Sequence, residues 1–225
     1  MSSIEFDRDD QYFATAGVSK KIKIFEYKSI VEQAHLETHS PIKEMACRSK
    51  ISCLCWSPYV QQRIASSDYE GIVSLWDAYT DKPVTVYEEH EKRAWSVDFS
   101  PAKPTIFASG SDDAKVKIWS VNQGHSVATI DSKANVCCVK FNPESCNHIA
   151  FGSADHHIHY FDLRNLREEL FVYRGHAKAV SYVRFLGADE IVSASTDSTL
   201  KLWSANRNEC KRTFTGHTNE RTLSA

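Results

Sequence analysis

The sequence predicts an all-β protein made of five consecutive units of four strands each, and three observations lead to this prediction. A short segment of alternating polarity around an aromatic recurs five times in the 225 residues, at intervals of 51, 43, 42 and 42 residues. A stretch of small residues precedes each segment, as in "FASGS", and before it a further segment ends in an aromatic, as in "AWSVDF". Alternation with a period of two residues is typical of half-buried strands. The recurring aromatics are Phe25, Trp76, Trp119, Phe161 and Trp203.

A strand-rich period of about 42 residues with Gly-His and Trp-Asp signals is the signature of WD repeats, which form the blades of a β-propeller. The Gly-His pair occurs in "RGH" and "TGH", and "EEH" is a variant. In such a repeat, the histidine of an interblade loop can bond the aspartate of a later turn, while the tryptophan packs in the third strand. We expect this structural role for His90, Asp113 and Trp119 in the third unit, and for His176, Asp197 and Trp203 in the fifth, with Ser193 or Ser195.

The repeats predict one domain that covers residues 1–225. The first unit lacks both the turn acid and the tryptophan, and its interval is about nine residues longer than the others. We assign the extra residues to a surface loop at about 28–49. The five units are expected to end near Tyr27, Asp77, Ser120, Arg164 and Ser204.

Composition excludes several classes of protein. The net charge is −2 with 25% charged residues, so no charge excess points to nucleic acid or to a membrane. Seven cysteines without a Cys-x-x-Cys pair indicate neither a disulfide framework nor structural zinc. The N-terminus has no signal region, and no apolar run reaches membrane-spanning length. We expect a soluble intracellular protein with no cofactor.

The segment "SADHHIHYFDLRN" resembles a metal site, because His156, His157 and His159 stand close to Asp155 and Asp162. The repeat gives these residues a different role. Asp155 falls at the turn of the fourth unit, and His157 and His159 alternate onto one face of its third strand. Two imidazoles can bind zinc, but the sequence positions no third ligand. We therefore expect a turn and a strand here, and an enzyme built on this cluster is the least favoured hypothesis.

No nucleophile elbow, phosphate loop or kinase motif occurs in the sequence, so we expect no catalytic residues. Binding in a propeller belongs by default to the loops at one end of the axis. The segments that lead into four consecutive inner strands each carry a basic residue before the closing aromatic, and Trp95 stands among them. This arrangement favours an acidic peptide. The basic residues are Lys50, Arg93 with Lys92, Lys133 and Lys178.

At these segments the sequence resembles the C-terminal propeller of the constitutive photomorphogenic family of RING-type ubiquitin ligases. The resemblance runs from residue 2 to about residue 220. The related suppressor-of-phytochrome-A proteins share "EHEKRAWSVDFS", whereas "SADHHIHYFDLR" is similar to the ligase itself. Further matching segments are "FATAGVSKKIKIFEY", "SGSDDAKVKIW" and "NVCCVKFNP".

The resemblance implies a domain that reads degradation signals. Propellers of this family capture peptides in which an acidic stretch precedes a Val-Pro pair, carried by transcription factors, photoreceptors or pseudokinase adaptors. Such a protein is expected in the nucleus and cytoplasm. The peptide site of the family matches Lys50, Tyr69, Arg93, Trp95 and Lys178.

The resemblance also implies two protein partners. The family docks a cullin-4 adaptor through Trp-Asp-x-Arg boxes, and "FDLR", with Asp162 and Arg164, resembles such a box with Phe161 in place of the tryptophan. The alternative, a strand end followed by a turn, stays open. Suppressor-of-phytochrome-A type proteins are expected partners in plants.

The sequence departs from the family in two respects. The family propeller has seven blades and this chain has five recognisable ones, and Leu223 stands where the family has an aromatic of the peptide site. No RING or coiled coil precedes the first unit, so we expect a form truncated at both ends that does not transfer ubiquitin by itself. The leading hypothesis is the substrate-recognition propeller of a ubiquitin ligase. The alternative is a scaffold or competitor that binds partners without ligase action.

Overall fold

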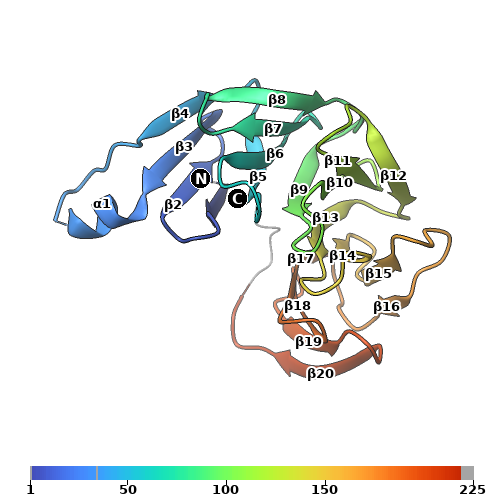
Figure 1. The fold of residues 1–225 in the computed structure, drawn as a ribbon. Coiled ribbons are helices and arrows are strands. Elements are labelled where there is room, and N and C mark those ends of the chain that lie inside the picture. The colour runs from blue at the N-terminus through green and yellow to red at the C-terminus, as the bar shows by residue number, and fades with distance from the viewer. Residues whose placement is uncertain (1, 34, 219–225) are drawn as a thin grey trace.

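Five four-stranded antiparallel sheets follow one another around an arc in the computed structural model, which describes residues 2–33 and 35–218 (Figure 1). Within each sheet the strands follow in chain order, so that strands adjacent in the sheet are also consecutive in the chain. This arrangement confirms the predicted all-β fold of propeller blades. None of the described helical residues forms a helix with the length and apolar character that a membrane crossing needs.

The first strand of each sheet lies nearest the axis and the fourth lies at the rim. The first sheet contains β1 (Ser3–Phe6), β2 (Tyr12–Ala16), β3 (Lys21–Glu26) and β4 (Lys43–Ala46). The second contains β5 (Ile51–Trp56), β6 (Arg63–Asp68), β7 (Val73–Asp77) and β8 (Lys82–Tyr87). The third contains β9 (Ala94–Phe99), β10 (Ile106–Ser111), β11 (Lys115–Ser120) and β12 (Ser126–Asp131).

The last two sheets repeat the pattern. The fourth sheet contains β13 (Val136–Phe141), β14 (His148–Ser153), β15 (Ile158–Asp162) and β16 (Phe171–Tyr173). The fifth contains β17 (Val180–Phe185), β18 (Glu190–Ser195), β19 (Leu200–Ser204) and β20 (Glu209–Phe214).

The boundaries differ from the prediction at the rim. The units expected to end near Tyr27, Asp77, Ser120, Arg164 and Ser204 end there only in their third strands, and each sheet continues into a fourth. The segment 28–49, expected to be a surface loop, holds most of helix α1 (Tyr27–Glu32) and strand β4. Rim strands bury few side chains, and in β4 only Met45 is buried, so the alternation that reveals a strand is weak there.

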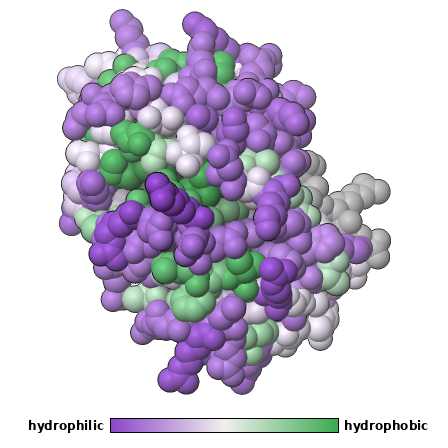
Figure 2. All heavy atoms as spheres, turned by 90° about the vertical axis from the view of Figure 1, so that its right-hand side faces the viewer, coloured by the Kyte–Doolittle hydropathy of each residue, from purple (hydrophilic) through white to green (hydrophobic). Residues whose placement is uncertain are grey.

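The core lies between neighbouring sheets. The inner strands β1, β5, β9, β13 and β17 contact one another in that order, and each of four apolar clusters joins residues of two adjacent sheets. Gly110 in β10 permits this approach, because a Cβ atom there would lie 2.5 Å from Cγ1 of Val136 in the next sheet. The rim beside the third and fourth sheets is mostly hydrophilic, with hydrophobic side chains in separate patches (Figure 2).

The structure brings together the histidine, aspartate and tryptophan of the third sheet. Nδ1 of His90 lies 2.7 Å from Oδ2 of Asp113, and Nε2 lies 2.7 Å from Oγ of Ser109. The indole of Trp119 donates to the same Oγ at 2.8 Å. All of these hydrogen bonds are shielded from water, so the set joins an interblade loop firmly to the sheet that follows it.

The fifth sheet repeats the set and decides between the two candidate serines. His176 lies 2.9 Å from Oδ2 of Asp197 and 2.7 Å from Oγ of Ser193, which also accepts the indole hydrogen bond of Trp203 at 2.8 Å. Ser195 instead donates to a backbone carbonyl. Ser193 is therefore the equivalent of the serine in the third sheet.

Candidate functional site

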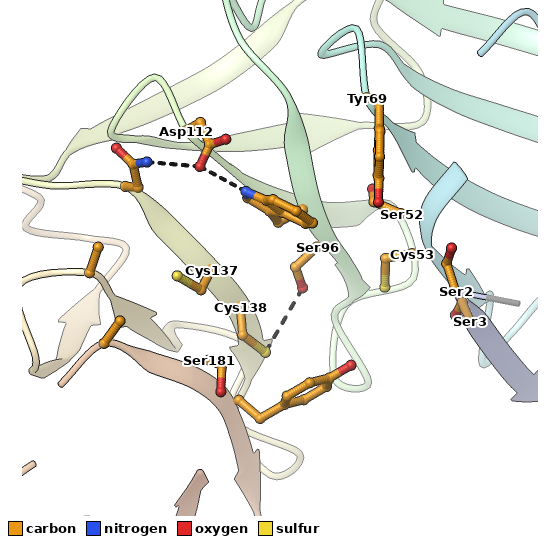
Figure 3. Close-up of a pocket in the computed structure, with 15 residues that line it drawn as sticks. Ser2, Ser3, Ser52, Cys53, Tyr69, Ser96, Asp112, Cys137, Cys138 and Ser181 are labelled. Atoms are coloured by element: carbon orange, nitrogen blue, oxygen red, sulfur yellow. Dashed lines mark hydrogen bonds between the residues drawn. The ribbon is translucent and has the colours of Figure 1, made fainter. Parts of the chain in front are cut away.

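A cavity of about 340 Å³ opens at the axial end where the inner strands begin, and residues of all five inner strands line it or lead into it (Figure 3). Tyr69 stands on one side of the cavity and Asp112 on the other, with Ser96 and Cys138 deeper between them. Residues from sheets far apart in the sequence thus line one cavity.

A bulge repeated in four sheets sets the direction of the cavity side chains. In each of β5, β9, β13 and β17, one residue falls outside the pairing with the second strand of its sheet. A bulge re-aims the side chain of the extra residue. The four bulge residues all line the cavity, and they are Ser52, Trp95, Cys137 and Ser181.

Arg93 stacks over two aromatic rings that line this cavity, those of Tyr69 and Trp95. The carbon of its guanidinium lies 4.4 Å from the ring centre of Tyr69 and 4.7 Å from that of Trp95. The two rings are 5.7 Å apart and inclined at 63°. A cation held over aromatic faces is stabilised by the ring quadrupoles, so the three side chains form one preorganised surface.

Two further residues, which the sequence analysis missed, hold the stack in place. Oδ1 of Asp112 accepts hydrogen bonds from Nε1 of Trp95 at 2.7 Å and from Nδ2 of Asn135 at 2.9 Å (Figure 3). The backbone N–H of Asp112 donates to the carbonyl of Arg93 at 2.9 Å. In the sequence, the one feature that could have indicated a role for Asp112 is that it immediately precedes the turn acid Asp113.

The backbone shows which of the basic residues are equivalent. The carbonyls of Lys50, Arg93, Asn135 and Ala179 each accept the N–H of a turn residue of their own sheet. Lys50 and Arg93 therefore hold the same position in the repeat, and Lys178 lies one residue earlier than its equivalent. In the fourth sheet, Asn135 rather than Lys133 holds this position.

Three cationic side chains at this end, those of Lys50, Arg93 and Lys178, have no acidic partner within the described part of the chain. Lys50 and Lys178 are exposed, and neither they nor Arg93 form an ion pair with a described carboxylate. Nε of Arg93 is also buried without a hydrogen-bond acceptor. The positive charge of this end of the axis is thus available to an anionic ligand.

The thiols that line the cavity are neutral and act as packing side chains. Burial raises the pKa values of Cys53 and Cys138, and it raises the pKa of Cys137 to about 12. A cysteine nucleophile acts as the thiolate, and these thiols keep their protons at neutral pH. The arrangement therefore supports binding of a side chain in the cavity rather than covalent chemistry.

Asp162 and Arg164 lie at the opposite end of the fourth sheet and bind each other. Nε of Arg164 lies 3.0 Å from Oδ1 of Asp162, and Nη2 lies 2.6 Å from Oδ2. The hydrogen bonds from Arg164 lower the pKa of Asp162 to about 2. The side chain of Arg164 is 69% exposed, so this fork presents an ordered cation to solvent.

Two histidines of the fourth sheet have protein partners: carboxylates contact His159, and an arginine contacts His157. Nε2 of His159 lies 2.9 Å from Oδ2 of Asp155, and Nδ1 lies 2.7 Å from Oε1 of Glu169. Nε2 of His157 instead lies 2.8 Å from Nη1 of Arg174. Within residues 2–33 and 35–218, no group of three or more histidine, cysteine or acidic residues is placed to hold a metal ion.

The position at which the resemblance implies an aromatic, Leu223, lies outside the described residues. The five residues Lys50, Tyr69, Arg93, Trp95 and Lys178 all belong to the end of the axis where the cavity opens. Asp162 and Arg164 belong to the other end. The two predicted sites are thus separate surfaces of the molecule.

Comparisons with known proteins agree with this architecture. Residues 36–77, 81–120, 123–162 and 167–204 match the family model "WD domain, G-beta repeat". The chain is 60% identical to the E3 ubiquitin-protein ligase COP1 of Pisum sativum and to that of Arabidopsis thaliana, over 98% of this chain and 33% of each relative. It is 52% identical to Protein SPA1-RELATED 4 of Arabidopsis thaliana, over 96% of this chain and 28% of that protein. The chain thus spans about a third of the length of these relatives.

Proposed function

The chain belongs to the WD domain, G-beta repeat family, and on this premise we propose that it is the substrate-recognition domain of a COP1-like ubiquitin ligase. In this proposal its axial site binds acidic peptides that carry a Val-Pro pair. The ligase reaction belongs to the assembled enzyme, in which this domain selects the protein to be degraded.

One observation carries the proposal, namely the stacking of Arg93 over the adjacent rings of Tyr69 and Trp95 beside a cavity of about 340 Å³. The rings offer rigid apolar area for the Val-Pro pair, and the cavity receives its side chains. The unpaired cations attract the acidic stretch, with Lys50 and Lys178 at its sides.

Charge and apolar contact would contribute to peptide binding at this site in different ways. An acidic peptide gains from long-range attraction during the encounter, and the apolar pair gains from desolvation once it is bound. The two contributions explain why a recognition sequence would combine charge with a short apolar anchor. The proteins proposed to carry it are transcription factors, photoreceptors and pseudokinase adaptors, and we place this function in the nucleus and cytoplasm.

The test is a titration of one labelled acidic Val-Pro peptide against the protein and two variants. Trp95→Ala should weaken binding by about 2–4 kcal/mol, because the ring is the central apolar anchor. Tyr79→Ala is the matched control, since it removes an exposed aromatic of the second sheet that does not line the cavity. Equal affinity of the Trp95→Ala variant and the parent protein would refute the proposal, as would equal binding of a peptide with Ala-Ala in place of Val-Pro.

We further propose that Asp162 and Arg164 contact the cullin-4 adaptor. The exposed guanidinium, held by Asp162, supports this role, because a preorganised arginine loses little entropy on binding. Suppressor-of-phytochrome-A type proteins are the second class of partner that we propose for a plant chain.

A further inference from the structure

The second sheet has a cavity where the third and fifth sheets hold a histidine ring. His90 and His176 each stand nine residues before the aromatic that closes an inner strand, and in the second sheet this position is Cys47. The serine and the tryptophan of the set are retained, because the indole of Trp76 donates to Oγ of Ser66 at 2.9 Å, whereas Glu70 stands at the position of the aspartate. The second sheet thus has the indole and the hydroxyl of the set without the imidazole.

The cavity has a volume of about 130 Å³. It is smaller than the roughly 300–1,000 Å³ of typical ligand pockets, but several times the roughly 30 Å³ that one water occupies in the liquid. Trp76 and the apolar side chains of Ile51 and Val86 form part of its wall. Its size therefore suits a single small ring.

Two buried hydroxyl groups that line the cavity have hydrogen-bonding capacity to spare. Ser66 is 2% exposed and accepts the bond from Trp76, and no acceptor among the described residues takes its own hydrogen. In the third sheet the equivalent hydroxyl is bonded to Nε2 of His90. Ser74 is 9% exposed, lines the same cavity, and has no hydrogen-bond partner among the described residues.

A buried carboxylate supplies the complementary acceptor. Asp68 is 5% exposed, and its Oδ1 accepts the backbone N–H groups of Glu70 and Ile72, both at 2.9 Å. Both of these bonds go to the same oxygen, and Asp68 lines the cavity. A ligand that donates to this carboxylate and accepts from a serine hydroxyl gains the free energy of those hydrogen bonds.

We propose that this cavity binds an imidazole ring, with its bare nitrogen accepting from the Ser66 or Ser74 hydroxyl and its N–H donating to Asp68. The edge of the ring would face Trp76, as His90 and His176 face their tryptophans with ring centres 6.1 and 6.0 Å apart. Burial raises the pKa of the Cys47 thiol to about 11, so Cys47 remains a neutral wall of the site. The imidazole can come from a small heterocyclic compound or from a histidine side chain of a partner protein.

The indole N–H of Trp76 is a built-in reporter, because it donates to the serine that the ligand would contact. We would titrate ¹⁵N-labelled protein with imidazole above its pKa and follow the indole resonances. The Trp76 signal should shift saturably, whereas those of Trp119 and Trp203 should stay fixed, because their serine partners already hold a histidine. Equal drifts of all three signals, or no shift at Trp76, would overturn the proposal.

Two variants and a second ligand complete the test. Cys47→His should fill the cavity and weaken imidazole binding at least tenfold, while Ser74→Ala, which keeps the cavity, should weaken it less. If Cys47→His does not fold, the Ser74→Ala variant still decides, since unchanged affinity there together with unchanged affinity for pyrrole, which lacks the acceptor nitrogen, would contradict the proposed contacts. A capped histidine that shifts Trp76 identifies a partner side chain as the source, and a response to imidazole alone identifies a small compound. Peptide binding at the axial site is not involved, so the result is independent of the proposed function.

Discussion

The indole of Trp95 donates a hydrogen bond of 2.7 Å to Oδ1 of Asp112. The bond fixes the ring plane that Arg93 covers, and Asn135 of the next sheet donates to the same oxygen. A carboxylate is an unfavourable neighbour for an acidic peptide, so its place here is explained by the position that it gives to Trp95. Asp112 is therefore a positioning residue of the proposed site.

The first prediction concerns this bond. Asp112→Ala should weaken binding of the acidic Val-Pro peptide about tenfold, which is about 1.4 kcal/mol, because Trp95 loses its acceptor. Asp112→Asn keeps an acceptor oxygen and should bind closer to the parent protein. Fluorescence anisotropy of a labelled peptide measures both. Tighter binding by both variants would show that repulsion by the carboxylate outweighs its positioning role.

The second prediction separates charge from apolar contact. Lys50→Ala should weaken peptide binding clearly at low salt and little at high salt, because an exposed cation acts through a screened field. The loss in Trp95→Ala should be nearly independent of salt. Lys133→Ala serves as a control, since Lys133 lies two residues away from the equivalent position, which Asn135 holds. A salt-independent loss in Lys50→Ala would contradict the steering role.

The third prediction is a fall in stability with falling pH. Burial lowers the pKa of His176, so the unfolded chain takes up this proton more readily than the folded chain, and stability decreases as the pH falls below about 6.5. Burial would raise the pKa of Asp197, but hydrogen bonds, among them those from Thr199 and His176, lower it instead. The contribution of Asp197 to the free energy of unfolding is therefore present above about pH 4 and is lost as the pH falls further.

Urea denaturation at a series of pH values measures this effect. His176→Gln should be less stable at neutral pH and should lose part of the pH dependence between about pH 7 and pH 5. His125→Gln, which changes an exposed histidine, should retain the full dependence. If the free energy of unfolding changes with pH equally in the parent protein and in His176→Gln, the pH dependence belongs to other groups.

The fourth prediction concerns the histidine cluster of the fourth sheet. Asp155→Ala should destabilise the protein by about 1–3 kcal/mol, because Nε2 of His159 and the backbone N–H of His157 lose their acceptor. Thermal denaturation measures this loss. Protein purified without added metal should contain no stoichiometric zinc. If it does contain zinc, and the His157→Ala variant does not, the cluster is a metal site rather than only a turn and a strand.

The fifth prediction concerns the other end of the fourth sheet. Arg164→Ala should reduce capture of the cullin-4 adaptor complex without changing peptide affinity, because the two surfaces are separate. Arg167→Ala removes a nearby exposed arginine and should leave capture intact. If Arg164→Ala captures as much adaptor as the parent protein, Asp162 and Arg164 have only a structural role.

The repeat made a large part of the fold predictable. Its period assigned His90 and Asp113 to one hydrogen-bonded set although they are far apart in the chain, because equivalent positions of successive units take equivalent places. The rim was less predictable, since a strand such as β4 buries one side chain and carries little alternation. The pairing of His159 with Glu169 was hidden for a related reason, because Glu169 lies in a connection outside the repeated pattern.

The sequence by itself determined the all-β architecture, the phase of the repeat and the basic residues that lead into the inner strands, because these follow from the spacing of side chains along one chain. Only the tertiary structure decided that Trp95 sits on a bulge, that Asp112 and Asn135 hold it, and that Cys47 leaves a cavity beside Ser66. The bulge depends on how β9 pairs with β10, whereas the Asn135 contact and the cavity depend on where neighbouring sheets meet. A contact between sheets is set by packing in three dimensions, and no spacing within one repeat encodes it.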